Sequence, residues 1–111
     1  MKVLFIQPLK APKIVEIDGS LESMQKLVGG HIETIYPFQD SEICLICNEE
    51  SKIENLPFNR ALYTPDGEIY DIIAGSFFIC SAPSDSENFE SIEDEKLPFL
   101  MQRFKAIEYY I

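Results

Sequence analysis

The chain has 111 residues, a hydrophobic fraction of 46% and a formal net charge of −10, so its length fits one domain and its composition excludes a disordered chain. This much negative charge on a small domain opposes binding to nucleic acid or anionic membranes and favours a partner with a basic surface. No apolar run has membrane-spanning length, and Pro8 interrupts the start MKVLFIQPLK too early for a signal peptide, which predicts a cytoplasmic protein.

The first part of the sequence predicts three strands and one helix. Residues 2–7 and the alternating residues 13–17 read as strands that could form a hairpin. A serine N-cap and a Gly-Gly pair bracket a helix within residues 20–30. The helix would turn one apolar face inward, formed by Leu21, Met24, Leu27 and Val28. Residues 31–37 predict a third strand, closed by a proline.

The middle of the sequence alternates buried strands with turns. ICLIC, residues 43–47, is a continuous apolar run and predicts an interior strand. NEESKIENLPFNRAL, residues 48–62, has no sustained period and predicts a loop that leads into a brief strand over residues 61–63. TPDG has the pattern of a type I turn. The runs EIYDII and SFFIC predict two strands or one bent strand.

The last part of the sequence predicts a C-terminal helix at about residues 94–108. Ser91 and Asp94 resemble a weak capping box, and Pro98 marks a helix start or a kink. One apolar face would contain Leu97, Leu100, Met101, Phe104 and Ile107. We therefore predict a single α+β domain over residues 1–111, with a single, mainly antiparallel sheet and two helices packed on it.

The three cysteines allow two interpretations. Cys44 and Cys47 form a CxxC pair, and His31 and Cys80 could complete a tetrahedral zinc site if their strands were neighbours. However, positions three apart on a strand face opposite sides of a sheet, so a chelating pair would need a bulge. The alternative is three reduced, buried thiols that behave as small hydrophobic groups, with no cofactor.

No set of catalytic groups can be assembled from the sequence. His31 is the only histidine and has no obvious nucleophile. Gly29-Gly30 is not a phosphate loop, because Lys26 precedes the glycines instead of following them. We therefore do not expect an enzyme. Arg60 is predicted to be a buried anchor that pairs with an acid and fixes the loop, or else an anion-binding residue.

Most of the acidity lies in the second half of the chain. Residues 85–95 (DSENFESIEDE) hold six acids and no base. They could form a solvated linker, and Glu49 and Glu50 could pair with Lys52 or bind a divalent ion. The sequence instead suggests that the later carboxylates gather on a common exterior patch that binds a basic protein. The predicted contact residues are Glu49, Glu50, Glu54, Asp66, Glu68, Asp71, Asp85, Glu87, Glu90, Glu93, Asp94 and Glu95.

Three long phrases of the sequence carry a resemblance to a known family. EIDGSLESMQKLVGGHIETIYPF, ICNEESKIENLPFNRAL and DGEIYDIIAGSFFI resemble, in order and spacing, the domain of unknown function 3846 family over about residues 2–105. Family members often have an aromatic residue in place of His31 and a glycine in place of Ser51. The resemblance implies a small protein of Gram-positive bacteria, their phages or conjugative elements, with no established enzymatic activity.

Two functional hypotheses follow. Small acidic proteins of mobile elements often act against host defence, so the first is an anti-CRISPR or anti-restriction inhibitor that binds the basic surface of a host enzyme such as a CRISPR effector nuclease. The second is a small metal- or ligand-binding domain that uses residues 48–62 and the thiols as its site.

Overall fold

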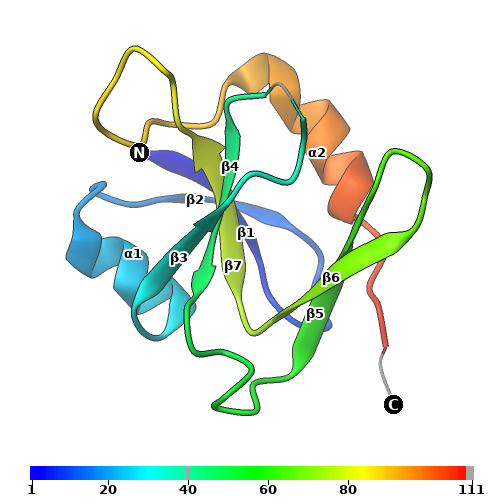
Figure 1. Ribbon diagram of the computed structural model, residues 1–111. Coiled ribbons are helices and arrows are strands. Elements are labelled where there is room, and N and C mark those ends of the chain that lie inside the picture. Colours follow the sequence, from blue (N-terminus) through cyan, green and yellow to red (C-terminus); the bar gives the residue numbers. More distant parts are fainter. Residues whose placement is uncertain (40, 110–111) are drawn as a thin grey trace.

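The computed structural model describes residues 1–39 and 41–109 and has an α+β fold, as predicted (Figure 1). The elements follow in the order β1 (Lys2–Ile6), β2 (Lys13–Glu16), α1 (Leu21–Val28), β3 (Ile32–Ile35), β4 (Ile43–Asn48), β5 (Phe58–Tyr63), β6 (Ile69–Ala74), β7 (Phe77–Ser81), the 3-10 helix η1 (Asp94–Lys96) and α2 (Leu97–Phe104). Neither α-helix of this described part is long and apolar enough to cross a membrane.

The predicted mainly antiparallel sheet with two helices is confirmed, and the structure adds a small second sheet where the prediction had only one. Five antiparallel strands make the main sheet in the order β2-β1-β7-β4-β3, and β5 and β6 form a separate hairpin. Gly75 redirects the chain between β6 and β7 with a φ of 75°, where Leu56 leaves only 2.8 Å for an added Cβ. The hairpin still joins the main core, because Leu62 and Ile73 pack in it.

The two helices cover opposite faces of the main sheet. On one face α1 packs Met24 and Val28 against Val3, Phe5, Cys44, Ile46, Phe78 and Cys80. On the other face α2 packs Leu100 and Phe104 against Leu4, Ile6, Leu45, Phe77 and Ile79. Successive residues of a strand point to opposite faces, so a central strand covered on both sides must be apolar throughout. This explains the unbroken run ICLIC, and every residue of β4 is buried.

Helix α1 has the ends that the sequence predicts. The Ser20 hydroxyl accepts a hydrogen bond from the Ser23 N–H at 3.1 Å, and Gly29 ends the helix with a φ of 81°. Two members of the predicted apolar face, Met24 and Val28, are buried. Leu21 is not: 54% of its surface is exposed. This side chain in the first turn is available for contacts outside the core.

Helix α2 is shorter than predicted. It ends at Phe104 instead of about residue 108, and Pro98 lies in its first turn, so the proline starts the helix and does not kink it. The predicted capping box is absent, because the Ser91 hydroxyl accepts a hydrogen bond from the Lys2 N–H at 2.9 Å. Ile107, predicted to lie on the inner helical face, follows the helix and is 37% exposed.

The acidic segment before η1 is built into the main sheet. The pairing of β1 with β7 stops before the outer ends of both strands, and residues 90–92 fill the gap. Ser81 and Glu90 exchange two backbone hydrogen bonds of 2.9 and 2.8 Å, and the Ile92 N–H donates to the Lys2 carbonyl at 2.9 Å. Ile92 is buried in the core. Residues 83–91 therefore form a strap that is fixed at its C-terminal end.

Candidate functional site

The structure does not bring the predicted zinc ligands together. Cys44 and Cys80 lie opposite each other on β4 and β7, on the face covered by α1. Cys47 points to the other face, as expected for positions three apart on a strand, and its Sγ lies 3.8 Å from the Glu33 carbonyl oxygen. His31 is exposed at the entrance to β3. Among the described residues, no three His, Cys, Asp or Glu side chains meet in a metal-binding arrangement.

All three cysteines are buried, and the chemistry of two of them, Cys47 and Cys80, agrees with the buried-thiol interpretation. Burial, with the nearby Glu33 carboxylate, raises the pKa of Cys47 to about 12. The contact with the Cys44 thiol, together with burial, raises the pKa of Cys80 far above its ordinary value. Both thiols therefore stay protonated at neutral pH. A protonated thiol is a poor nucleophile and a poor metal ligand.

Arg60 is fully buried, as one interpretation predicted, and the hydrogen bonds described here join it to carbonyl and amide oxygens instead of to the predicted acid. Its Nε donates to the Phe104 carbonyl at 3.1 Å, and its Nη2 donates to the Lys10 carbonyl at 2.8 Å. Its Nη1 donates to the Asn59 side-chain oxygen at 2.8 Å. These bonds tie β5 to the end of α2 and to the turn between β1 and β2. The role visible in these contacts is structural.

The loop after β4 is also held by a buried polar side chain. The Asn48 amide donates to the Val28 carbonyl at 3.3 Å and to Glu54 at 3.2 Å, while its oxygen accepts from the Glu50 N–H at 2.8 Å. The strand that follows begins at Phe58, earlier than predicted. This loop turns the chain around the end of α1, with Glu49 and Glu50 exposed.

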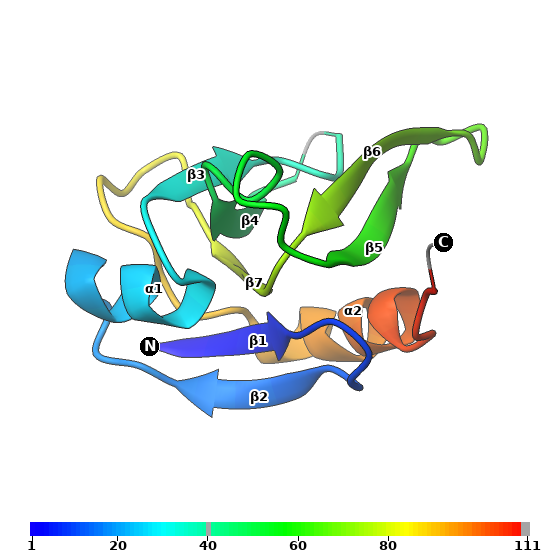
Figure 2. The ribbon, with the colours of Figure 1, turned by 90° about the horizontal axis from the view of Figure 1, so that it is seen from below.

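The predicted acidic residues do not share one patch. Except for Asp71, they occupy three separate places: the loop of residues 49–54, the tip of the β5–β6 hairpin around residues 66–68, and the segment from the strap to η1 (Figures 1 and 2). Asp71 lies within β6 and is bonded to Lys52 of the loop. The hairpin extends away from the main sheet, so its tip and the strap lie at opposite ends of the molecule (Figure 2). The prediction of a common patch is therefore wrong. It failed because sequence distance does not show which edge of the fold a loop reaches.

Three of the predicted contact acids are partly neutralised by a lysine. Asp71 pairs with Lys52 at 2.7 Å, Glu93 with Lys96 at 3.4 Å, and Asp94 with Lys2. Within the described ranges, the remaining predicted contact acids have no ion pair; these are Glu49, Glu50, Glu54, Asp66, Glu68, Asp85, Glu87, Glu90 and Glu95. Two of the unpaired acids, Glu87 and Glu90, border a cavity.

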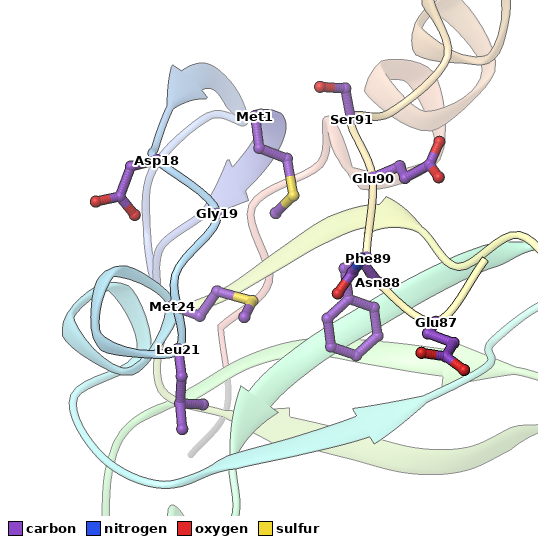
Figure 3. Close-up of a pocket in the computed structure, with 10 residues that line it drawn as sticks. All are labelled: Met1, Asp18, Gly19, Leu21, Met24, Glu87, Asn88, Phe89, Glu90 and Ser91. Carbon is purple, nitrogen blue, oxygen red and sulfur yellow. The ribbon is translucent and has the colours of Figure 1, made fainter.

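This cavity lies between the strap and the start of α1 and has a volume of about 750 Å³ (Figure 3). One wall consists of residues 18–24, and the other consists of residues 87–91. The side chains of Met1, Met24 and Phe89 face the space between the walls. We call this feature the groove; it combines an apolar interior with acidic walls.

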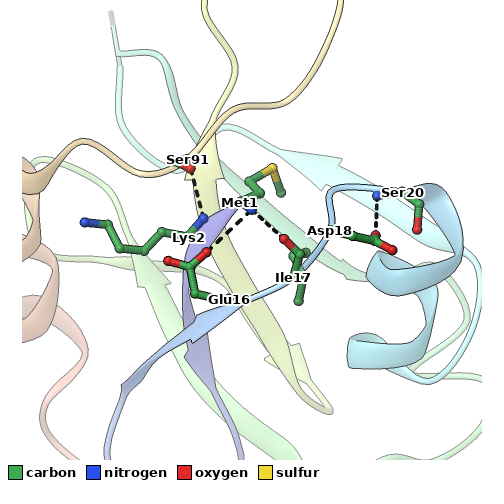
Figure 4. A network of polar contacts seen from close by, with 7 residues as sticks. All are labelled: Met1, Lys2, Glu16, Ile17, Asp18, Ser20 and Ser91. Atoms are coloured by element: carbon green, nitrogen blue, oxygen red, sulfur yellow. Dashed lines mark hydrogen bonds and ion pairs between the residues drawn. The ribbon is translucent and has the colours of Figure 1, made fainter.

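Polar contacts fix both walls of the groove (Figure 4). The Asp18 carboxylate accepts from the Ser20 N–H at 2.8 Å, which holds the chain before α1. The bond from Lys2 to Ser91 holds the strap against β1. Between them, the Met1 ammonium group contacts the Ile17 carbonyl and lies 3.6 Å from Glu16. The walls are thus positioned by contacts to the first two strands.

The charge on the first wall persists in acid. Hydrogen bonds from the hydroxyl and the N–H of Ser20, with a contribution from Ser23, lower the pKa of Asp18 to about 2. This carboxylate is therefore negative across the physiological range. Glu87 and Glu90 are exposed on the facing wall. The groove consequently presents negative charge on both sides.

The groove is open to solvent. Seven of its ten lining residues are exposed, and only Met24 is buried. Sites for small molecules usually enclose most of the ligand surface. An open, partly apolar groove is better suited to a segment of another macromolecule.

Sequence reasoning found half of this site. It identified the acids of residues 85–95, including Glu87 and Glu90. It missed Asp18, and it assigned Met24 to the core alone. The signal that joins the two walls is the insertion of residues 90–92 between β1 and β7, and this is a tertiary feature without a local sequence pattern.

The comparisons with known proteins give one match. The family model described as a domain of unknown function (DUF3846) matches residues 1–105. No curated protein and no solved structure matches the chain.

Proposed function

We propose, for a chain that belongs to the DUF3846 family, a protein-binding function in which the groove accepts a basic segment of a partner protein. The observation that carries this proposal is an open cavity that has apolar side chains at its centre and carboxylates without an ion pair on both walls. The aliphatic stems of lysine and arginine can pack on apolar atoms while their charged ends reach carboxylates. No metal and no catalytic step are required.

The partner best suited to this surface is a protein that binds nucleic acid. Its basic surface would be attracted by a domain with a net charge of −10. A protein bound there would compete with the nucleic acid for the same cations. In its most specific form, the proposal is an inhibitor of a host defence enzyme, of the anti-CRISPR or anti-restriction kind, that acts in the bacterial cytoplasm.

A displacement assay tests the proposal. A CRISPR effector nuclease from a Gram-positive bacterium is loaded with a fluorescent oligonucleotide, and the chain is titrated in at low salt. We expect displacement by the wild type and weaker displacement by a Glu87→Gln/Glu90→Gln variant. An Asp66→Asn/Glu68→Gln variant is the matched control, because it removes the same charge from the hairpin tip.

Two results would contradict the proposal. One is an absence of displacement at low salt. The other is equal loss of displacement in both double variants, which would show that net charge acts without any contribution from the groove.

A further inference from the structure

We infer that the partner segment inserts one apolar side chain into the groove and carries basic residues on both sides of it. The inference rests on the proposed function and adds the chemical pattern of the partner.

The orientation of the side chains that line the groove carries the inference (Figure 3). The thioethers of Met1 and Met24 project into the space between the walls, and the ring of Phe89 faces it from the strap. The carboxylates of Asp18, Glu87 and Glu90 point away from this space, toward the outer sides of the two walls. The centre of the groove is therefore apolar, and its charge lies at the margins.

This arrangement does not suit a cation at the centre. A lysine or arginine head group placed between the thioethers and the ring would lose water without gaining a carboxylate partner, and such a loss is costly. An apolar side chain gains from the same surroundings. Methionine side chains adapt their shape to what they contact, so leucine, isoleucine, methionine or phenylalanine can serve as the inserted group.

The acidic margins of the groove determine which partner residues can lie on either side of the inserted side chain. Asp18 stands on one wall, and Glu87 and Glu90 stand on the other. Basic residues before and after the apolar group would each reach one wall. Leu21 borders the same groove, with its side chain directed away from the centre (Figure 3). It is 54% exposed, so it offers apolar surface at the margin that the partner would cover. Small buried apolar contacts surrounded by a polar rim are the usual pattern of energetically important interface residues.

Peptide probes test the pattern. Three fluorescent peptides of equal length are compared by anisotropy at low salt: Lys-Lys-Leu-Lys-Lys, Lys-Lys-Ser-Lys-Lys and Lys-Lys-Lys-Lys-Lys. We expect the leucine peptide to bind about tenfold more tightly than the serine peptide, the effect of burying one leucine side chain. The pentalysine peptide should not exceed the leucine peptide, although it carries more charge.

A matched pair of protein variants locates the effect. Leu21→Ser should weaken binding of the leucine peptide about threefold to fivefold and leave the serine peptide unchanged. Ile69→Ser is the control, because Ile69 is also 54% exposed and lies on β6 in the hairpin. It should bind both peptides like the wild type. Both positions are exposed, so thermal unfolding should confirm that both variants fold.

The outcomes separate this inference from the proposed function. Suppose that the leucine and serine peptides bind equally well and that both lose affinity for the Glu87→Gln/Glu90→Gln variant. The inference of an inserted apolar side chain is then overturned, and the proposal of a basic partner is supported. The inference is also overturned if Leu21→Ser and Ile69→Ser reduce binding of the leucine peptide equally. If none of the peptides binds at low salt, the proposed function itself fails.

Discussion

The two ends of the molecule carry similar exposed acids in different settings. At the hairpin end, Asp66 and Glu68 stand on a protruding turn that is closed by a bond from the Gly67 N–H to the Thr64 carbonyl at 2.9 Å. At the groove end, Glu87 and Glu90 border a cavity with an apolar interior. The comparison teaches that acidity alone does not define a binding site. A hollow apolar surface beside the acids is what distinguishes the groove end.

The two ends also differ in how they are held. The hairpin is attached through buried polar side chains: the Asn59 amide donates to the carbonyls of Ile6 and Gly75, both at 2.9 Å, and Arg60 bonds to the end of α2. The groove end depends on backbone pairing of the strap and on exposed contacts. We therefore expect changes at the hairpin to affect stability and changes at the groove to affect binding.

The largest expected effect is on stability at the hairpin end. Arg60→Met removes the donor that serves the carbonyls of Phe104 and Lys10 and the Asn59 side-chain oxygen, and should lower the free energy of unfolding by about 3 kcal/mol. Urea unfolding followed by circular dichroism measures this change. Leu21→Ser at the groove should lower stability by less than about 0.5 kcal/mol. Equal stability of Arg60→Met and wild type would contradict the anchor role.

The next effect is on binding at the groove end. Glu87→Gln/Glu90→Gln should weaken binding of a lysine-rich peptide about fivefold to tenfold, because each exposed charge pair contributes up to about 1 kcal/mol. Isothermal titration calorimetry at low salt provides the affinity. Asp66→Asn/Glu68→Gln should change it by less than about twofold. The reverse order of the two variants would assign binding to the hairpin.

The dependence of binding on salt concentration compares the same two ends of the molecule, and we expect a smaller change in affinity than for the double variants. Raising the salt concentration from about 0.05 to 0.5 M should weaken peptide binding about fivefold in the wild type, because exposed charge interactions are screened. Glu87→Gln/Glu90→Gln should show a shallower dependence on salt than the hairpin double variant. Identical slopes in these two variants would mean that the groove carboxylates contribute nothing specific.

The smallest effect concerns Asp18 and pH. Its pKa is lowered from 3.8 to about 2 in the folded chain, so it contributes stability that is present above pH 3.8 and is lost as the pH falls through about 2. Asp18→Asn removes this contribution. The melting temperatures of wild type and variant should differ slightly near neutral pH and converge toward pH 2. A difference that grows in acid would contradict the assigned shift.

Local patterns in the sequence predicted the elements well. The serine and glycine ends of α1, the buried run ICLIC and the turn TPDG each follow from one or a few adjacent residues. The opposite faces of Cys44 and Cys47 follow from the period of a strand. The match to the family over residues 1–105 confirms the resemblance carried by long phrases of the sequence.

These local patterns did not predict how the elements pack together. The second sheet ends where the chain turns at Gly75 between β6 and β7, and the runs EIYDII and SFFIC do not show which sheet each joins. The groove arises because residues 90–92 enter the space between β1 and β7. The acids of residues 85–95 could be recognised as a candidate contact, but the apolar partners opposite them could not.

The central claim is that the groove end, and not the hairpin end, binds a basic segment with an apolar residue at its centre. Amide chemical-shift mapping by NMR, with Lys-Lys-Leu-Lys-Lys titrated into the labelled chain, tests it most directly. The account predicts shifts concentrated at residues 18–24 and 87–91. Shifts concentrated at residues 63–70, or spread evenly over all exposed acids, would contradict it.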